Sequence, residues 1–404
     1  MRTLFEVQKV IIQEFEQHPF YERAIFDRVT LDNKLTGIVG SCGVGKTTYL
    51  IHKAIECGAK QEKALYVLAD NIFFLNNKLI DLVDWLYKET DVKLLCIDEI
   101  HKYSGWQQEL KNISDIYRSF RVLFSGSSMI DIIRGKYDLS RRATMHSMYG
   151  FSFREYLKVA IGVEFPQITL DEILKSHSAL TQKLDVPKIL KHFNDYLRNG
   201  YYPYLLELVQ DQEKFQAIDN ACKKTIYEDI ATIHSLKTPT LQIIEKLFKY
   251  VLVTPAGELS VNKLASVLGR SFDNVSEYLS ILQEAGLVRF LFPKQTGKAH
   301  LRNPEKIYPD NVNMLQYLTL PNIQDNIVGK IRETFFLSHC QNANYTVFYN
   351  KEGDFKIGNF VFEIGGKNKT TKQIKDVPNS FLVIDGILTG SKNTIPLFLF
   401  GLLY

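Results

Sequence analysis

Short apolar runs alternate with helix-length segments in the first part of the chain. Four such runs, each of four or five residues, lie at 36–40, 64–68, 94–98 and 122–125. Runs this short, apolar along their whole length and separated by helix-length stretches, are typical of parallel strands that are buried on both faces of a sheet. The pattern therefore predicts a doubly wound α/β domain over residues 1–150.

The pattern becomes helical after Gly150. Leu, Lys and Glu recur at helical spacing, with an interruption at 200–203 that contains Gly and Pro. Long stretches of this kind, without strand-like runs, predict a helical lid domain over residues 151–240.

Two further domains are predicted in the rest of the chain. Helical patterns at 261–268 and 274–284 precede a strand-like run at 286–292, an order that is typical of a winged-helix domain over 241–310. Residues 325–404 begin with a helical pattern and continue in short apolar strands. The predicted fold class is therefore α/β, with a parallel-sheet domain, a helical lid, a winged helix and a small C-terminal α/β domain.

Composition narrows the class of protein. The chain has 404 residues, which suggests two or three domains, and 45% of them are hydrophobic, as in an ordinary globular protein. The formal net charge is +4, so that contacts with a nucleic acid would need a local basic patch. The five cysteines lie far apart, which predicts neither a disulfide framework nor a zinc module. The first residues lack the apolar run of a signal peptide, and no stretch has the roughly 20 apolar residues that span a membrane, so we expect a cytoplasmic protein without a membrane partner.

A glycine-rich loop follows the first predicted strand. Residues 40–47 read GSCGVGKT and match the pattern GxxxxGK[ST] of a phosphate-binding loop, with a strand before it and a helical segment after it. In such a loop successive backbone amides surround the phosphates at a helix N-terminus, and glycine permits the close approach. Lys46 is expected to reach the β- and γ-phosphates and the Thr47 hydroxyl to bind Mg²⁺. The predicted nucleotide-binding residues are Gly40, Ser41, Cys42, Gly43, Val44, Gly45, Lys46, Thr47 and Thr48.

An acidic pair ends the third apolar run. Asp98 stands at the carboxyl end of the predicted strand and is expected to bind Mg²⁺ directly or through water. Glu99 follows it and is placed to polarise an attacking water, which predicts hydrolysis. Ser125, at the end of the next run, is a candidate contact of the γ-phosphate or of water, and a simple Ser-Gly turn is its alternative. The nucleotide is inferred to be ATP, because the chain has no Asn-Lys-x-Asp box for guanine.

These motifs resemble a bacterial and archaeal family of AAA-type ATPases. The likeness is carried by residues 40–47, by Asp98-Glu99-Ile100-His101 with Trp106, Leu110 and Lys111, by 125–128, and by the block Phe151-Ser152-Phe153-Arg154-Glu155-Tyr156-Leu157. Members of this family carry a winged helix and a C-terminal domain related to the PD-(D/E)xK nucleases. The resemblance implies Mg²⁺-dependent binding and hydrolysis of ATP.

The resemblance also implies an arginine that stabilises charge on the transferred phosphoryl group, supplied by the same or by a neighbouring subunit. Arg142 aligns best with the Gly-Arg dipeptide of the family, although Arg141 replaces its glycine. Arg134 is a second candidate, and the alternative is that both are surface charges.

Asp98-Glu99-Ile100-His101 also spells a DExH helicase box. A helicase of that class needs a second RecA-like domain with an arginine-rich motif, which this sequence lacks. This disfavours the helicase interpretation.

The expected partner is DNA or a protein. The second helix of the predicted winged helix carries Asp273 and Glu277 and no basic residue, which is unfavourable for a DNA-reading helix. Basic residues near it or in the predicted wing are the candidate phosphate contacts: Arg270, Arg289, Lys294, Lys298 and Arg302. A contact with a protein is the alternative, and the oligomeric state is left open.

The C-terminal segment resembles the arrangement of the nucleases in part. Asp354 and Glu363 are candidate Mg²⁺ ligands, and Glu333 is a third carboxylate. The family pattern is Glu-x-Lys, but Gly365 occupies the lysine position and Lys367 is the first lysine after Glu363. An active nuclease site and a fold retained for recognition are both compatible with this pattern. Two alternatives to a turning-over ATPase therefore stay open, a nucleotide-controlled switch and a DNA-processing ATPase.

Overall fold

The computed structural model describes residues 1–126, 139, 141–184, 186–294, 304–319 and 325–404. The chain divides into two compact units, one of residues 1–149 with 232–234 and one of residues 150–231 with 235–404. Among the described residues, no helix is long and apolar enough to span a membrane.

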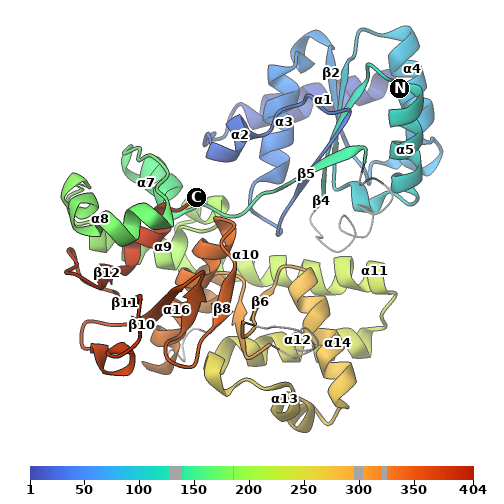
Figure 1. The fold of residues 1–404 in the computed structure, drawn as a ribbon. Coiled ribbons are helices and arrows are strands. Elements are labelled where there is room, and N and C mark those ends of the chain that lie inside the picture. Colours follow the sequence, from blue (N-terminus) through green and yellow to red (C-terminus); the bar gives the residue numbers. More distant parts are fainter. Residues whose placement is uncertain (127–138, 140, 185, 295–303, 320–324) are drawn as a thin grey trace. The chain divides into compact units, whose positions relative to one another are not determined.

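The first unit is built on a five-stranded parallel sheet (Figure 1). The strand order is β2-β3-β4-β1-β5, with β1 Leu35–Val39, β2 Ala64–Leu68, β3 Leu94–Asp98, β4 Arg121–Gly126 and β5 Ala143–Ser147. Every residue of β1 and β3 is buried, which explains their continuous apolar character. The prediction of a buried parallel sheet is confirmed. The strand β5 was not predicted.

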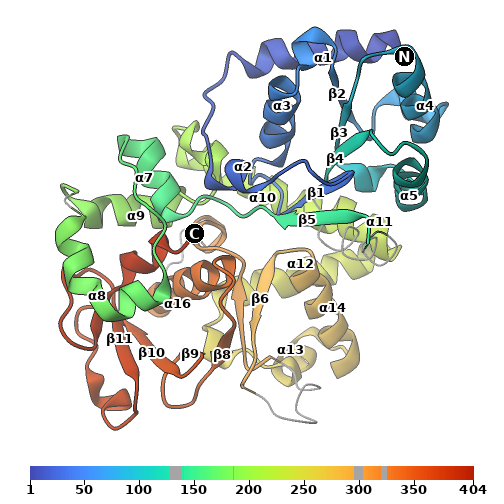
Figure 2. The same cartoon turned by 45° about the horizontal axis from the view of Figure 1, so that its top comes forward.

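Helices cover both faces of this sheet (Figure 2). One face carries α1 and α3, and the other carries α4 and α5. The apolar side chains of α4 and α5 pack with those of the strands in one core. The helices are α1 Arg2–Phe15, α2 Ala24–Arg28, α3 Lys46–Glu56, α4 Leu79–Glu89 and α5 Trp106–Ile116, with short 3-10 turns η1 Ala59–Gln61, η2 Ile72–Leu75 and η3 Ile100–Lys102.

The second unit begins with helices. Capping explains where two of them start, because Ser152 and Glu155 form a reciprocal capping box at α7, and Thr169 and Glu172 form one at α8. These helices are α7 Phe153–Ile161, α8 Leu170–Lys183, α9 Ile189–Asn199, α10 Asp211–Lys224, α11 Ala231–His234, α12 Thr238–Val253, α13 Val261–Leu268 and α14 Phe272–Glu284, with 3-10 turns η4 Pro203–Leu206 and η6 Ala256–Glu258 and a π-helical segment η5 Thr225–Ile230. A two-stranded antiparallel sheet of β6 Val288–Leu291 and β7 Lys306–Pro309 follows, then α15 Val312–Leu318.

A second five-stranded sheet ends the chain. Its order is β12-β11-β10-β9-β8, in which β10, β11 and β12 run parallel and β8, β9 and β10 antiparallel. Helix α16 Asp325–Asn342 packs on it, with β8 Val347–Tyr349, β9 Phe355–Ile357, β10 Phe360–Gly365, β11 Ser380–Ile384, β12 Thr394–Pro396 and the 3-10 turns η8 Thr371–Ile374 and η9 Leu397–Leu402.

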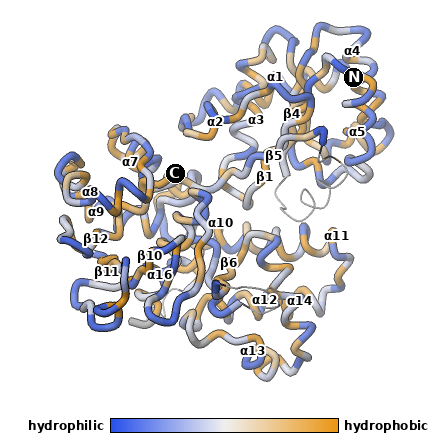
Figure 3. Tube along the Cα trace, viewed as in Figure 1, coloured by the Kyte–Doolittle hydropathy of each residue, from blue (hydrophilic) through white to orange (hydrophobic). Residues whose placement is uncertain are grey.

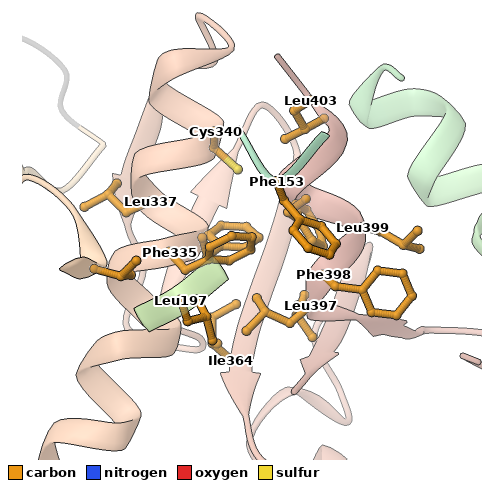
Figure 4. Packing of buried hydrophobic residues seen from close by; sticks show 14 of the residues in the cluster. Phe153, Leu197, Phe335, Leu337, Cys340, Ile364, Leu397, Phe398, Leu399 and Leu403 are labelled. Atoms are coloured by element: carbon orange, nitrogen blue, oxygen red, sulfur yellow. The ribbon is translucent and has the colours of Figure 1, made fainter. Parts of the chain in front are cut away.

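One apolar core joins the early helices to this C-terminal sheet. Phe153 of α7, Leu197 of α9, Phe335 of α16, Ile364 of β10 and Leu397 of η9 lie in the same cluster (Figure 4). Most of its members are completely buried. Apart from 232–234, residues 150–404 therefore form one compact unit. The division of this unit into a helical lid, a winged helix and a C-terminal domain stays a prediction.

The alternation of apolar and polar residues follows these elements (Figure 3). Apolar residues concentrate on the strands and on the inward faces of the helices, as the burial pattern requires.

Candidate functional site

The glycine-rich loop of residues 40–47 connects β1 to α3. Gly43 and Gly45 adopt positive φ angles of 85° and 101°, a conformation that glycine accepts without strain, and Gly45 is the N-cap of α3. A β-carbon on Gly40 would lie 2.1 Å from the carbonyl oxygen of Met148, so only glycine fits there. The loop therefore brings backbone amides to the N-terminus of α3, where the helix dipole favours an anion.

Lys46 is folded into this loop. Its side chain is buried, and Nζ donates hydrogen bonds to the carbonyl oxygens of Gly40 and Ser41, each at 2.8 Å. The ammonium group thus lies where the loop would surround a phosphate, and it can exchange these carbonyl partners for phosphate oxygens.

Thr47 and Asp98 are in direct contact. The Thr47 hydroxyl donates to Asp98 Oδ2 at 2.6 Å, although the two residues are 51 positions apart in the sequence. Asp98 is 1% exposed and stands at the carboxyl end of β3. A hydroxyl and a carboxylate next to a phosphate loop are oxygen ligands of the kind that Mg²⁺ prefers, together with phosphate oxygens.

Two hydroxyl groups hold the Asp98 carboxylate in place. Tyr66 on β2 donates to Oδ2 at 3.0 Å, and Ser125 on β4 donates to Oδ1. Burial, with the nearby charge of Asp98 and the hydrogen bond to it, raises the pKa of Tyr66 far above its ordinary value, so this phenol stays a donor. Sequence reasoning missed Tyr66, whose signal is a hydroxyl-bearing residue in an otherwise apolar strand. It predicted Ser125 as a contact of phosphate or water, and the structure places its hydroxyl on Asp98.

Glu99 follows Asp98 in a left-handed backbone conformation, with φ 51° and ψ 46°. Its amide donates to Ser125 Oγ and to Asp98 Oδ1, both at 3.1 Å. Such a conformation is unfavourable for a residue with a side chain, and residues of this kind cluster at functional sites. The Glu99 carboxylate forms an ion pair with Lys102 at 2.7 Å.

Arg23 supports the phosphate loop from the N-terminal segment. Its guanidinium donates to the carbonyl oxygens of Val44, inside the loop, and of Tyr149, at 2.9 Å and 2.8 Å. The side chain is buried. Sequence reasoning missed this residue, because nothing in the local sequence links position 23 to the loop.

Arg142 lies at the opposite end of the sheet from the phosphate loop. Strand β5 runs parallel to β1 with Ala143 opposite Leu35, so Arg142 is beside the start of β1, whereas the loop follows its end. Five residues of strand separate the two ends by about 16 Å. The guanidinium pairs with Asp115 at 2.8 Å instead. Arg142 is therefore too far from the phosphate loop to stabilise the phosphoryl group bound in its own subunit, which corrects that expectation. A role of Arg142 at the site of a neighbouring subunit stays a prediction. Arg134 lies outside the described residues.

The basic residues predicted to contact DNA have different environments. Arg289 is buried and pairs with Asp310 at 2.8 Å, and it also donates to Gln341 and Asn342 on α16. These contacts stabilise the packing of β6 on α16 and occupy the guanidinium of this candidate phosphate contact. Arg270 and Lys294 are exposed, while Lys298 and Arg302 lie outside the described residues.

Lysines neutralise the carboxylates of the C-terminal unit. Lys306 on β7 lies 3.1 Å from Asp354 and 3.3 Å from Glu333. Burial raises the pKa of Glu333, and the charge of Asp354 acts in the same direction. Glu363 on β10 pairs with Lys369 through Oε1, and its buried Oε2 has no hydrogen-bond partner among the described residues. The lysine that pairs with Glu363 is therefore Lys369.

Nowhere in the described part of the chain do three or more His, Cys, Asp or Glu side chains form a ready metal site. The site around Thr47 and Asp98 nevertheless fits Mg²⁺ that arrives with a nucleotide, since this ion is usually held by one or two carboxylates together with substrate phosphates. The glycine cradle and the buried Lys46 fit the phosphates themselves.

Comparisons with known proteins identify the domain that carries this site. Residues 32–157 match a family described as "AAA domain", and residues 190–322 match a domain of unknown function, DUF8612. Two relatives from Methanocaldococcus jannaschii are the uncharacterized proteins MJ1637, 26% identical over 88% of this chain and 80% of its own length, and MJ1544, 22% identical over 85% and 75%.

A solved structure with partial likeness is the Walker-type ATPase paby2304 of Pyrococcus abyssi. It is 9% identical, with a TM-score of 0.42 over 76% of this chain and 99% of that chain, a likeness too distant to carry an argument. The family match over residues 32–157 agrees with the parallel sheet and its phosphate loop, and both support an AAA-type P-loop domain in this part of the chain.

Proposed function

We propose that the N-terminal unit binds ATP with Mg²⁺ and hydrolyses it. The observation that carries this proposal is the contact between Thr47 and Asp98, beside a glycine loop that already encloses the Lys46 ammonium group. A phosphate loop alone would support binding. The addition of a buried, hydrogen-bonded aspartate and a following glutamate supports hydrolysis.

Each residue has a separate task in this proposal. The loop amides and Lys46 bind the phosphates and stabilise negative charge on them. Thr47 and Asp98 hold Mg²⁺, which draws charge from the phosphate oxygens when it is bound. Tyr66 and Ser125 keep the Asp98 carboxylate in one orientation. Glu99 accepts a proton from the attacking water. Arg23 stabilises the conformation of the loop through its hydrogen bond to the Val44 carbonyl oxygen.

Replacing Lys46 by Ala tests the assignment. We expect loss of ATP binding, measured by equilibrium titration with a fluorescent ATP analogue, because the only ammonium group that the described residues place inside the loop is removed. Lys53→Ala is the matched control, since Lys53 lies on the same helix and its ammonium group pairs with Glu56 at 2.7 Å, outside the loop of residues 40–47. Equal affinity of the wild type and Lys46→Ala would refute the proposal.

We propose that binding and hydrolysis of ATP control the interaction of this protein with a partner, which is either DNA or another protein. The helices α13 and α14 with the strands β6 and β7 follow the order of a winged helix, which supports DNA as one candidate. The burial of Arg289 and the acidic Asp273 and Glu277 on α14 favour a protein. Stimulation of ATP turnover by double-stranded DNA would select DNA, while indifference to DNA together with slow turnover would favour a nucleotide-controlled switch acting on a protein.

A nuclease in the C-terminal unit is a second candidate. The buried and unpartnered Oε2 of Glu363 favours it, because such an oxygen is a potential cation ligand. The ion pairs of Lys306 and Lys369 oppose a nuclease site, since these two lysines already neutralise the neighbouring carboxylates. DNA cleavage that requires Mg²⁺ and disappears in Glu363→Ala would support this site, and cleavage unaffected by that substitution would exclude it.

A further inference from the structure

A cavity of 490 Å³ lies at the edge of the first sheet where the strands β2 and β3 begin. Its lining comes from α1, from the turn before β2, and from the end of α4 with the residues that lead into β3. The strands β1, β2, β3 and β4 are parallel, so this edge is opposite the one that carries the phosphate loop. The cavity is therefore separate from the site of residues 40–47, and its volume is that of a site for a small ligand.

Two aromatic rings form the apolar wall of the cavity. Phe5 on α1 is buried and Trp85 on α4 is half-buried, and the two rings meet edge to face with their centroids 6.5 Å apart. The indole of Trp85 is thus the more accessible of the two rings. Of the aromatic side chains, the indole attracts a cation to its face most strongly.

Carboxylates dominate the rest of the lining, and Arg2 is the only cation among the described residues that line the cavity. The acidic lining residues are Glu6, Glu62, Glu89 and Asp91. Lys9 pairs with Glu6 at 3.1 Å and with Glu62 at 3.3 Å, which holds these two carboxylates on one side of the cavity. In the part of the chain that the structure describes, the side chains of Glu89 and Asp91 have no ion pair or hydrogen bond, so their charges can pair with a ligand.

The four carboxylates are too widely spread to share a metal ion. Among the described residues, no three His, Cys, Asp or Glu side chains lie close enough together to hold one. A divalent ion needs several oxygen ligands within about 2.6 Å, and it would leave the aromatic wall without a partner. A larger cation with an apolar part can contact the carboxylates and the aromatic wall together.

We propose that this cavity binds a small organic cation, which is an ammonium or guanidinium group on an apolar body. The charged group pairs with Glu89 and Asp91, and the apolar body packs on Trp85. A cleft lined mainly by one sign of charge attracts counter-ions, and contact of the cation with the indole adds to the attraction. This inference is independent of the proposed ATPase activity, because the cavity lies at the other edge of the sheet.

Isothermal titration calorimetry of the full-length chain with matched probes tests the proposal. We expect saturable binding of 2-phenylethylamine or of benzylguanidine, which differ in the charged group. Binding of 2-phenylethanol, which has the body of 2-phenylethylamine without its charge, should be weaker by about tenfold or more. If neither cation shows saturable binding up to about 10 mM, or if the alcohol binds as tightly as the amine, the proposal is overturned.

Substitutions of the lining carboxylates test which groups hold the cation. Glu89→Gln and Asp91→Asn each remove one charge, and each is expected to weaken binding by about two- to fivefold, as for the loss of a partly exposed ion pair. Asp81→Asn is the matched control, because Asp81 is an exposed acid on α4 that does not line the cavity. Unchanged affinity in both lining variants, or an equal loss in all three variants, would contradict the assignment.

Tryptophan emission locates the bound cation. The chain has two tryptophans and Trp106 is 2% exposed, so we expect a change of emission on binding to come from Trp85. Trp85→Phe should keep calorimetric binding, since phenylalanine preserves an aromatic wall, and should lose the change of emission. No change in the wild type, or a change that persists in Trp85→Phe, would place the cation elsewhere and overturn the proposed site.

Discussion

The close approach of Gly40 to Met148 yields a sharp prediction for Gly40→Ala. The added β-carbon would lie 2.1 Å from the Met148 carbonyl oxygen, roughly 1 Å inside an ordinary contact. Met148 cannot easily retreat, because it is buried and its amide donates to the carbonyl oxygen of Val39 at 2.7 Å. Overpacking of this kind costs about 1–3 kcal/mol of stability.

The loop must shift to relieve this contact, and the shift moves the amides that surround the phosphates. We therefore expect Gly40→Ala to lower the thermal midpoint of the N-terminal unit and to weaken ATP binding by about tenfold or more, the equivalent of at least about 1.4 kcal/mol. Thermal unfolding and titration with a fluorescent ATP analogue measure the two effects.

Gly329→Ala is the matched control for this substitution. Gly329 lies within α16, and no atom of the described residues outside its own helical turn lies within 4 Å of the position that its β-carbon would take. Since alanine is the better helix former, the control should gain about 0.5–1 kcal/mol and leave ATP binding unchanged. Unchanged stability and unchanged ATP affinity in Gly40→Ala would refute the assigned role of this close approach.

Three further predictions follow from single side chains. Burial lowers the pKa of Lys330 from 10.5 to about 7, so the unfolded chain binds more protons than the folded chain between these pH values. The free energy of unfolding should therefore rise with pH across this window, by on the order of 4 kcal/mol. Urea titrations at several pH values should show this slope for the wild type and its loss in Lys330→Met. Tyr66→Phe removes the hydrogen bond to Asp98 and should lower the free energy of unfolding by about 1.5–3 kcal/mol, and an unchanged urea midpoint would contradict that bond. Arg142→Ala should leave ATP affinity unchanged, because the residue pairs with Asp115 at the far end of the sheet, and a loss of affinity would contradict this placement.

The phosphate loop and the acidic pair after β3 could be predicted from sequence because both depend on local order. The loop needs glycines at fixed spacing between a strand and a helix, and Asp98 needs only to stand at the end of an apolar run. The buried strands β1, β2, β3 and β4 were visible for the same reason, since burial on both faces leaves an apolar run.

The strand β5 could not be predicted from the sequence, and the place of Arg142 beside it could not be predicted either. Residues 143–147 read ATMHS, and they are only partly buried, because β5 lies at the edge of the sheet. An edge strand need not be apolar throughout, so its sequence resembles a loop. Without β5, nothing indicates that Arg142 stands at the amino end of the sheet.

Contacts between side chains that are distant in the sequence could not be predicted from local patterns either. Arg23 reaches the carbonyl oxygen of Val44, and Lys306 reaches Glu333 and Asp354, over separations in the sequence that only tertiary packing closes. The apolar core that residues between 153 and 403 share could not be predicted either, because helical periodicity does not reveal which sheet a helix covers.

The most direct test of the central claim is steady-state hydrolysis of ATP with Mg²⁺ by the wild type and by Glu99→Gln, with ATP affinity measured on both. We expect the variant to bind ATP as the wild type does and its turnover to fall by about 100-fold or more, because the proton acceptor is lost while the loop and Asp98 are kept. Equal turnover in the two proteins would contradict the account.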